Sequence, residues 1–199
     1  MSGQGDLLLE DDAIWLDWLA TLHGTEVTNK ILYLLISHSF PLSLPVETSV
    51  KQELFESIQQ IAHNEKSLED LASDYAAIYL NGRLGISPYE SFYRDEDRLL
   101  RQKATMTVRQ KMRKYSIFST DSNLMQEDHV SQELFFVAYL VEKEEYREAA
   151  DFIRNHLLFF LESFVSGIPE GFYKYLTDLT ILYLKQLEEK LTRFHNQAI

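Results

Sequence analysis

Apolar residues recur along most of this chain at spacings of three and four positions, which is the period of an amphipathic helix. Within residues 46–63 one such stripe consists of Val50, Leu54, Ile58 and Ile61. The next helix is expected to begin at Ser67, an N-cap residue followed by two acids, and to end at Asn81-Gly82.

The same spacing predicts further helices on both sides of this pair. One ends at Gly24, and the others are expected over 26–39, 94–115, 128–143, 145–165 and 169–194, with Pro169 in the first turn of the last. Seven Gly and four Pro are few turn residues for 199 positions, which favours long helices over a sheet with many turns. We therefore expect an all-α fold, a single globular bundle of about eight to ten helices with no strand.

Two stretches break the helical pattern. Residues 82–93 contain glycine and proline together with an unusual number of aromatic side chains for a loop. Residues 116–127 are polar and aperiodic, so we expect them to form a hinge between an N-terminal part, 1–115, and a C-terminal part, 128–199, of one domain. Such a hinge would also allow a homodimer in which two copies exchange halves.

Composition excludes several classes of protein. The chain has no cysteine, which excludes disulfides, thiolate zinc sites, iron–sulfur ligation and cysteine nucleophiles. No stretch approaches the roughly 20 apolar residues that span a bilayer. The first twelve residues are acidic and lack the basic region of a signal peptide. We expect a cytoplasmic protein that does not insert into membranes.

No enzyme motif is found in the sequence. Metalloprotease, nucleophile-elbow, phosphate-loop and dinucleotide-binding patterns are all missing. None of the six histidines has a second histidine or a carboxylate at convincing metal-ligand spacing, and the adjacent residues Glu127, Asp128 and His129 cannot all face one metal. Asp128 is more simply interpreted as a helix cap. We predict a protein that is not an enzyme and has no metal site and no cofactor.

Charge points to a cationic partner. The net charge is −12, which repels nucleic acid and attracts basic segments. The distribution is uneven, because residues 94–114 carry eight Lys or Arg against three acids. A helical regulatory or nucleic-acid-binding protein that uses this basic segment is therefore an alternative.

Three blocks of sequence, in order, resemble the TorD/DmsD family and its NarJ relatives, cytoplasmic chaperones of molybdenum-containing reductases. The first is Asp74–Leu80 followed by Ile86–Tyr93, which contains Pro88-Tyr89-Glu90-Ser91. The second is Thr107-Val108-Arg109 through Tyr115. The third is Glu127-Asp128-His129 followed by Glu133-Leu134-Phe135-Phe136. A weaker Asn155-His156-Leu157 block follows in the expected order.

This chain departs from the family pattern at a few positions. Tyr79 and Asn81-Gly82 stand where the family commonly has Phe and then Gly-Pro, and Met125-Gln126 replaces the usual Glu-Pro before the Asp-His pair. Tyr89 stands where the dimethyl sulfoxide reductase chaperones often have Trp. The particular client, and whether a nucleotide or molybdopterin binds, therefore stay open.

The resemblance implies a chaperone that binds the twin-arginine signal peptide and the apo form of a molybdopterin-dependent oxidoreductase. It would aid cofactor insertion and delay export of that enzyme's catalytic subunit. Carboxylates suit the two guanidinium groups of such a peptide, and an aromatic groove suits the apolar stretch after them. The predicted signal-peptide-binding residues are Tyr75, Tyr79, Pro88, Tyr89, Glu90, Ser91, Tyr93, Glu127, Asp128 and His129.

Overall fold

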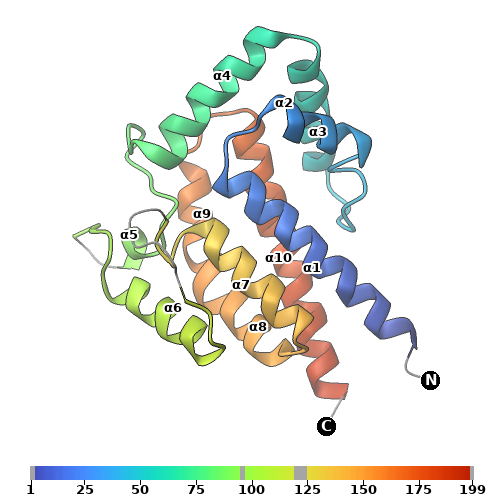
Figure 1. Ribbon diagram of the computed structural model, residues 1–199, viewed down its shortest axis with the longest axis vertical. Helices are drawn as coiled ribbons and strands as arrows, with labels where there is room; N and C mark the ends of the chain where they lie inside the picture. Colours follow the sequence, from blue (N-terminus) through green and yellow to red (C-terminus); the bar gives the residue numbers. More distant parts are fainter. Residues whose placement is uncertain (1–2, 95–96, 119–124, 198–199) are drawn as a thin grey trace. The chain divides into compact units, whose positions relative to one another are not determined.

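The computed structural model describes residues 3–94, 97–118 and 125–197. The helices are α1 (Gly3–Gly24), α2 (Asn29–Ser37), α3 (Ser49–Ala62), α4 (Glu65–Tyr75), α5 (Ser91–Arg94), α6 (Lys103–Lys114), α7 (Val130–Glu142), α8 (Tyr146–Phe152), α9 (Leu158–Ser166) and α10 (Phe172–Gln197) (Figure 1). Two π-helical segments, η1 (Ala76–Leu80) and η2 (Ile153–Leu157), continue α4 and join α8 to α9. The described residues contain no strand, so the all-α prediction is confirmed.

The chain divides into two compact units, each built from separate stretches of sequence. Unit 1 comprises residues 1–24, 88–160 and 187–199, and unit 2 comprises residues 25–87 and 161–186. Both sides of the predicted hinge at 116–127 belong to unit 1. Within that hinge, residues 119–124 lie outside the described residues, so a hinge and a homodimer by exchange of halves stay predictions.

Unit 1 is organised around α7, which packs along α1 and also contacts α8 and η2 (Figure 1). Its interior contains fully buried apolar side chains from all of these elements, among them Leu16, Leu19, Leu134, Phe152 and Ile153. Gly24, at the end of α1, allows close approach to α7, because a Cβ there would lie 2.3 Å from the Ser131 Oγ. Such close packing of apolar surface is the main source of stability in a unit of this size.

Unit 2 contains α2, α3 and α4 with the adjoining parts of α9 and α10. The predicted stripe in α3 faces its core, since Leu54, Ile58 and Ile61 are buried. The stop after η1 is also confirmed: Gly82 has a φ of +62°, a conformation that residues with a Cβ rarely adopt.

Four predicted helix boundaries are wrong, and local hydrogen bonds explain two of them. In the basic segment, residues 97–102 are not helical and α6 begins only at Lys103. α4 begins two residues before Ser67, because the Asn64 side chain accepts the Lys66 N–H at 3.1 Å and caps the helix. α7 is capped by His129 and not by Asp128, whose carboxylate accepts the Ser91 N–H instead. α10 begins at Phe172, so Pro169 precedes the helix. None of the described helices is both long and apolar enough to cross a membrane.

Candidate functional site

The two short blocks at 88–91 and 127–130 lie side by side in unit 1. The Glu90 N–H donates to the Asp128 carbonyl at 2.9 Å, and the Val130 N–H donates to the Pro88 carbonyl at 2.9 Å. These bonds form an isolated antiparallel bridge between Tyr89 and His129. Residues about forty positions apart in sequence are therefore neighbours in the structure. A site that includes both blocks requires them to be neighbours.

Asp128 and His129 stabilise this junction through buried hydrogen bonds. The Asp128 carboxylate accepts the Ser91 N–H at 3.0 Å, and the His129 Nδ1 accepts the Ser131 N–H at 3.1 Å. The His129 ring meets the Tyr89 ring edge to face, with 4.9 Å between centroids. Burial, with a smaller contribution from His23, lowers the pKa of His129 to about 3, so the ring is neutral at ordinary pH.

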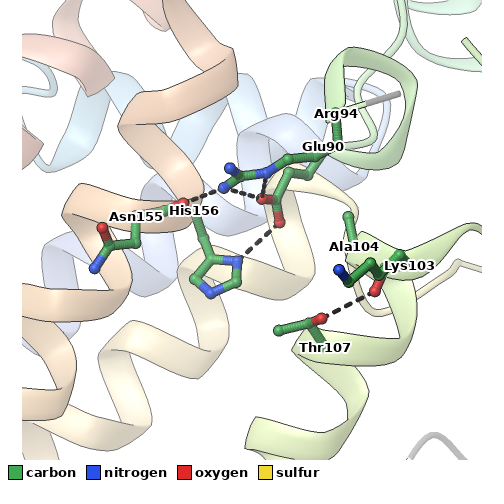
Figure 2. Close-up of a pocket in the computed structure, with 7 residues that line it drawn as sticks. All are labelled: Glu90, Arg94, Lys103, Ala104, Thr107, Asn155 and His156. Carbon is green, nitrogen blue, oxygen red and sulfur yellow. Dashed lines mark hydrogen bonds and ion pairs between the residues drawn. The ribbon is translucent and has the colours of Figure 1, made fainter. Parts of the chain in front are cut away.

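Glu90 is a second hub of the site and is fully buried. One of its carboxylate oxygens accepts the Arg94 Nε–H at 2.5 Å, and the other lies 2.9 Å from the His156 Nδ1 (Figure 2). Burial alone would raise the pKa of Glu90, but the hydrogen bond with His156 and the ion pair with Arg94 outweigh it and lower that pKa. Glu90 is therefore a charged group in the interior with two partners, from α5 and η2.

Glu133, on the first turn of α7, brings a second carboxyl to the same place. The nearest ligand atoms of Glu90, Glu133 and His156 all lie within 4.8 Å of one another. Neither oxygen of Glu133 has a hydrogen-bond partner among the described residues when the group is ionised. Burial first, and then the charge of Glu90, raise the pKa of Glu133 well above its ordinary value, which favours the protonated form, in which Glu133 can donate to Glu90.

This cluster was missed by the sequence analysis. Two carboxyls and an imidazole are a donor set that could hold a divalent cation, although the three residues are far apart along the chain. The three residues come from separate segments, and only the fold brings them together. Glu90 was a predicted site residue, whereas Glu133 and His156 appeared only as members of the family-like blocks.

A cavity of about 440 Å³ opens beside the cluster. It is lined by Glu90, Arg94, Lys103, Ala104, Thr107, Asn155 and His156 (Figure 2). Its walls therefore carry both signs of charge and several hydrogen-bonding groups. Six of these seven residues, all except Glu90, were not among the predicted site residues.

Glu127 lies at the edge of the junction and pairs with α6. Its two oxygens accept the Arg109 Nε–H at 2.7 Å and a terminal guanidinium N–H at 2.9 Å. Burial would raise the pKa of Glu127, but the Arg109 hydrogen bonds lower it below its ordinary value. The predicted arginine-binding carboxylates are thus occupied already: Glu127 by Arg109, Glu90 by Arg94, and Asp128 by a main-chain N–H.

The predicted aromatic residues fall into two groups. Tyr89 and Tyr93 are half-buried in unit 1, and Tyr93 stacks on Phe160 with 5.8 Å between ring centroids. Tyr75 and Tyr79 are buried in unit 2, where they stack on each other with 4.9 Å between centroids. Pro88 and Ser91 are buried at the junction.

Comparison with known proteins supplies the family. A family model described as nitrate reductase delta subunit matches residues 45–166, which include Glu90, Glu133 and His156. This chain belongs to the nitrate reductase delta subunit family. The resemblance to the TorD, DmsD and NarJ maturation chaperones is therefore confirmed at the level of the family.

Two named chaperones and one solved structure are moderately similar to this chain. The TorD chaperone of Shewanella pealeana is 27% identical over 190 residues, which cover 87% of this chain and 86% of the relative. The TorD chaperone of Vibrio parahaemolyticus is 27% identical over 191 residues, covering 84% and 88%. A crystal structure from Archaeoglobus fulgidus, described as a redox enzyme maturation protein, has the same fold, with a TM-score of 0.58 and 16% identity over 87% of this chain and 93% of that one.

Proposed function

We propose that this chain is a cytoplasmic chaperone that binds the twin-arginine signal peptide and the apo form of a molybdopterin-dependent oxidoreductase. Bound in this way, it delays export of the enzyme and aids insertion of its cofactor. The observation that carries the proposal is the family match over residues 45–166, joined by relatives that are named TorD chaperones. The acidic net charge of −12 favours capture of a segment with two arginines.

The proposed binding residues divide into two roles. Ser91 and Asp128 are buried and hydrogen-bonded to each other, so they would act by holding the 88–91 and 127–130 segments in shape, whereas the buried Glu90 lines the cavity. Tyr89 and Tyr93 are only half-buried, so their rings are available to a peptide. These polar residues can be fully buried because their partners lie within the site itself: Asp128 accepts the Ser91 N–H, and Glu90 pairs with Arg94 and His156.

The alternative of nucleic-acid binding through 94–114 is disfavoured by the contacts of that segment. Arg109 pairs with Glu127, and the Nζ of Lys111 lies 2.6 Å from a Glu148 oxygen. Lys114 approaches the same carboxylate at 3.5 Å. Much of the positive charge is therefore neutralised within the protein, which weakens the attraction for phosphate on which such binding depends.

Peptide binding by the purified full chain tests the proposal. Proteins that co-purify with the tagged chain from its native host would identify a client, and a fluorescent peptide with that client's signal sequence would then be titrated by anisotropy. The matched control peptide has both arginines replaced by lysine. We expect the lysine peptide to bind at least tenfold more weakly, because lysine cannot form the two-pronged guanidinium contact. Equal affinity for both peptides, or none for either, would contradict the proposal.

A further inference from the structure

The Arg94 guanidinium sits in a three-sided cradle at the wall of the cavity. Its Nε–H donates to the Glu90 carboxylate at 2.5 Å, and a terminal N–H donates to the main-chain carbonyl of Asn155 (Figure 2). On the third side the guanidinium carbon lies 3.5 Å from the centroid of the Phe159 ring. Carboxylate, carbonyl and aromatic face are the three partners that a guanidinium group binds best.

Arg94, the present occupant of the cradle, is more exposed than Glu90 and His156. Glu90 is held from behind by His156, and both Asn155 and His156 belong to the π-helical segment η2. Arg94, in contrast, is the last residue of α5, a helix of four residues, and its side chain is 31% exposed. The Arg94 side chain could therefore turn out to solvent without disturbing a longer helix.

Movement of Arg94 would uncover a site that already has the right shape and charge. Glu90 and Asn155 both line the 440 Å³ cavity, so a second side chain could reach them from there. Phe159 is 47% exposed although it is a large apolar ring, and a guanidinium group is what now covers its face. An incoming arginine would regain every contact that Arg94 gives up.

We propose that Glu90, the Asn155 carbonyl and Phe159 form a guanidinium-binding site, and that Arg94 occupies it until an arginine of a bound peptide displaces it. The inference rests on the proposed function, because the twin-arginine segment is the source of that arginine. The internal arginine makes the site selective. A lysine cannot donate in fixed geometry to Glu90 and Asn155 together, so it cannot compete with Arg94.

The peptide binds only molecules whose cradle is empty. Its apparent affinity is therefore the intrinsic affinity multiplied by the fraction of such molecules, and competition by Arg94 makes that fraction small. Removing the competitor should therefore strengthen binding, which is the opposite of what loss of an ordinary contact residue does. We expect Arg94→Ala to bind the twin-arginine peptide about tenfold more tightly than the wild type. Arg94→Gln, which keeps most of the side-chain stem, should show the same direction and serves if the alanine variant fails to fold.

Arg154→Ala is the matched control. Arg154 lies one residue before Asn155, pairs with Asp151 and Glu188 instead of Glu90, and its removal changes the net charge by the same amount. Its peptide affinity should stay within about twofold of the wild type, since exposed ion pairs contribute little. In the Arg94→Ala background, Phe159→Leu should reverse most of the gain by removing the aromatic face.

Two further measurements observe the cradle directly. In protein labelled with ¹⁵N-arginine, the Arg94 Nε–H resonance, assigned from its loss in Arg94→Ala, should move on addition of the arginine peptide and not of the lysine peptide. Methylguanidinium should raise the melting temperature of Arg94→Ala at millimolar concentration. It should leave the wild type and the Arg94→Ala/Phe159→Leu double variant unchanged.

The outcomes separate the two proposals. If the wild type binds the arginine peptide but Arg94→Ala binds no more tightly than Arg154→Ala, or the Arg94 resonance does not move, the displacement model is wrong and the chaperone function stands. If no variant binds the peptide, the proposed function fails, and the methylguanidinium titration decides alone whether the guanidinium site exists. Absence of a methylguanidinium effect on Arg94→Ala would then overturn it.

Discussion

Replacing Glu133 by glutamine should stabilise the protein at neutral pH. Glu133 is fully buried beside Glu90, and its raised pKa means that the folded protein holds a proton there which the unfolded chain releases. Glutamine has nearly the same shape as a protonated glutamate and donates through its amide N–H instead. The variant therefore keeps the hydrogen bond to Glu90 without requiring a proton from solution.

The size of the gain follows from proton linkage. A group whose pKa is raised on folding gives its full contribution below the unfolded value of 4.5, and that contribution is lost as pH rises toward the folded pKa. Each pH unit in that interval changes the free energy of unfolding by about 1.4 kcal/mol. At pH 7, which lies 2.5 units above the unfolded value of 4.5, the gain for Glu133→Gln can therefore reach, and not exceed, about 3.5 kcal/mol.

Urea unfolding followed by circular dichroism at pH 4.5, 6, 7 and 8 measures this difference. The two proteins should be almost equally stable at pH 4.5, and the variant should gain steadily as pH rises. Glu148→Gln is the control with the opposite sign, because the hydrogen bond from Lys111 lowers the pKa of Glu148. A Glu133→Gln variant that loses more than about 1 kcal/mol at every pH would refute the reasoning. It would show that Glu133 is ionised and holds a partner such as a bound cation.

Three further predictions concern the two units. His23 and His129 both have a pKa lowered to about 3 by burial, so each should remove up to about 1.4 kcal/mol of stability per pH unit as pH falls below 6.5. The free energy of unfolding is measured in the Glu133→Gln variant, in which Glu133 no longer titrates. A value that stays constant from pH 6.5 to 5 would contradict this prediction. Asp128→Ala should lower the free energy of unfolding by about 1–3 kcal/mol because it leaves a buried main-chain N–H without an acceptor, and Asp128→Asn should lose less. Gly167→Ala should lower the free energy of unfolding by about 1–3 kcal/mol, because its Cβ would lie 2.3 Å from the Cγ2 of Ile86. When Ile86→Ala is already present, the further loss caused by Gly167→Ala should be smaller. Melting temperatures of the two single variants and the double variant check the last prediction, and additive losses would exclude the clash.

The accuracy of the sequence-based predictions varied with the range of the interactions involved. The helix ending at Asn81-Gly82 and the stripe in α3 depend on residues within a few positions of one another, and both were correct. The cap of α4 was misplaced although it is local, because Asn64 and Ser67 are both good N-cap residues and the pattern did not distinguish them.

The candidate site shows more clearly what the sequence alone could not predict. The blocks around Glu90 and Asp128 were identified by their family-like order, and the structure brings them together through main-chain hydrogen bonds. The roles of these residues were not predicted. Asp128 accepts a buried main-chain N–H, and Glu90 pairs with Arg94 of the same chain. Glu133 was seen only as part of a helix motif, although it is a fully buried carboxyl of the site.

The sequence by itself determined the helical class, most of the helices and the family, because helix periodicity and short motifs are properties of neighbouring residues. The tertiary structure alone decided which charged groups meet. Glu90, Glu133 and His156 are 43 and 23 positions apart, and nothing in the three segments shows by itself that these side chains meet. Their pKa values and hydrogen bonds arise from burial and from charges on other helices, and both depend on how those helices pack.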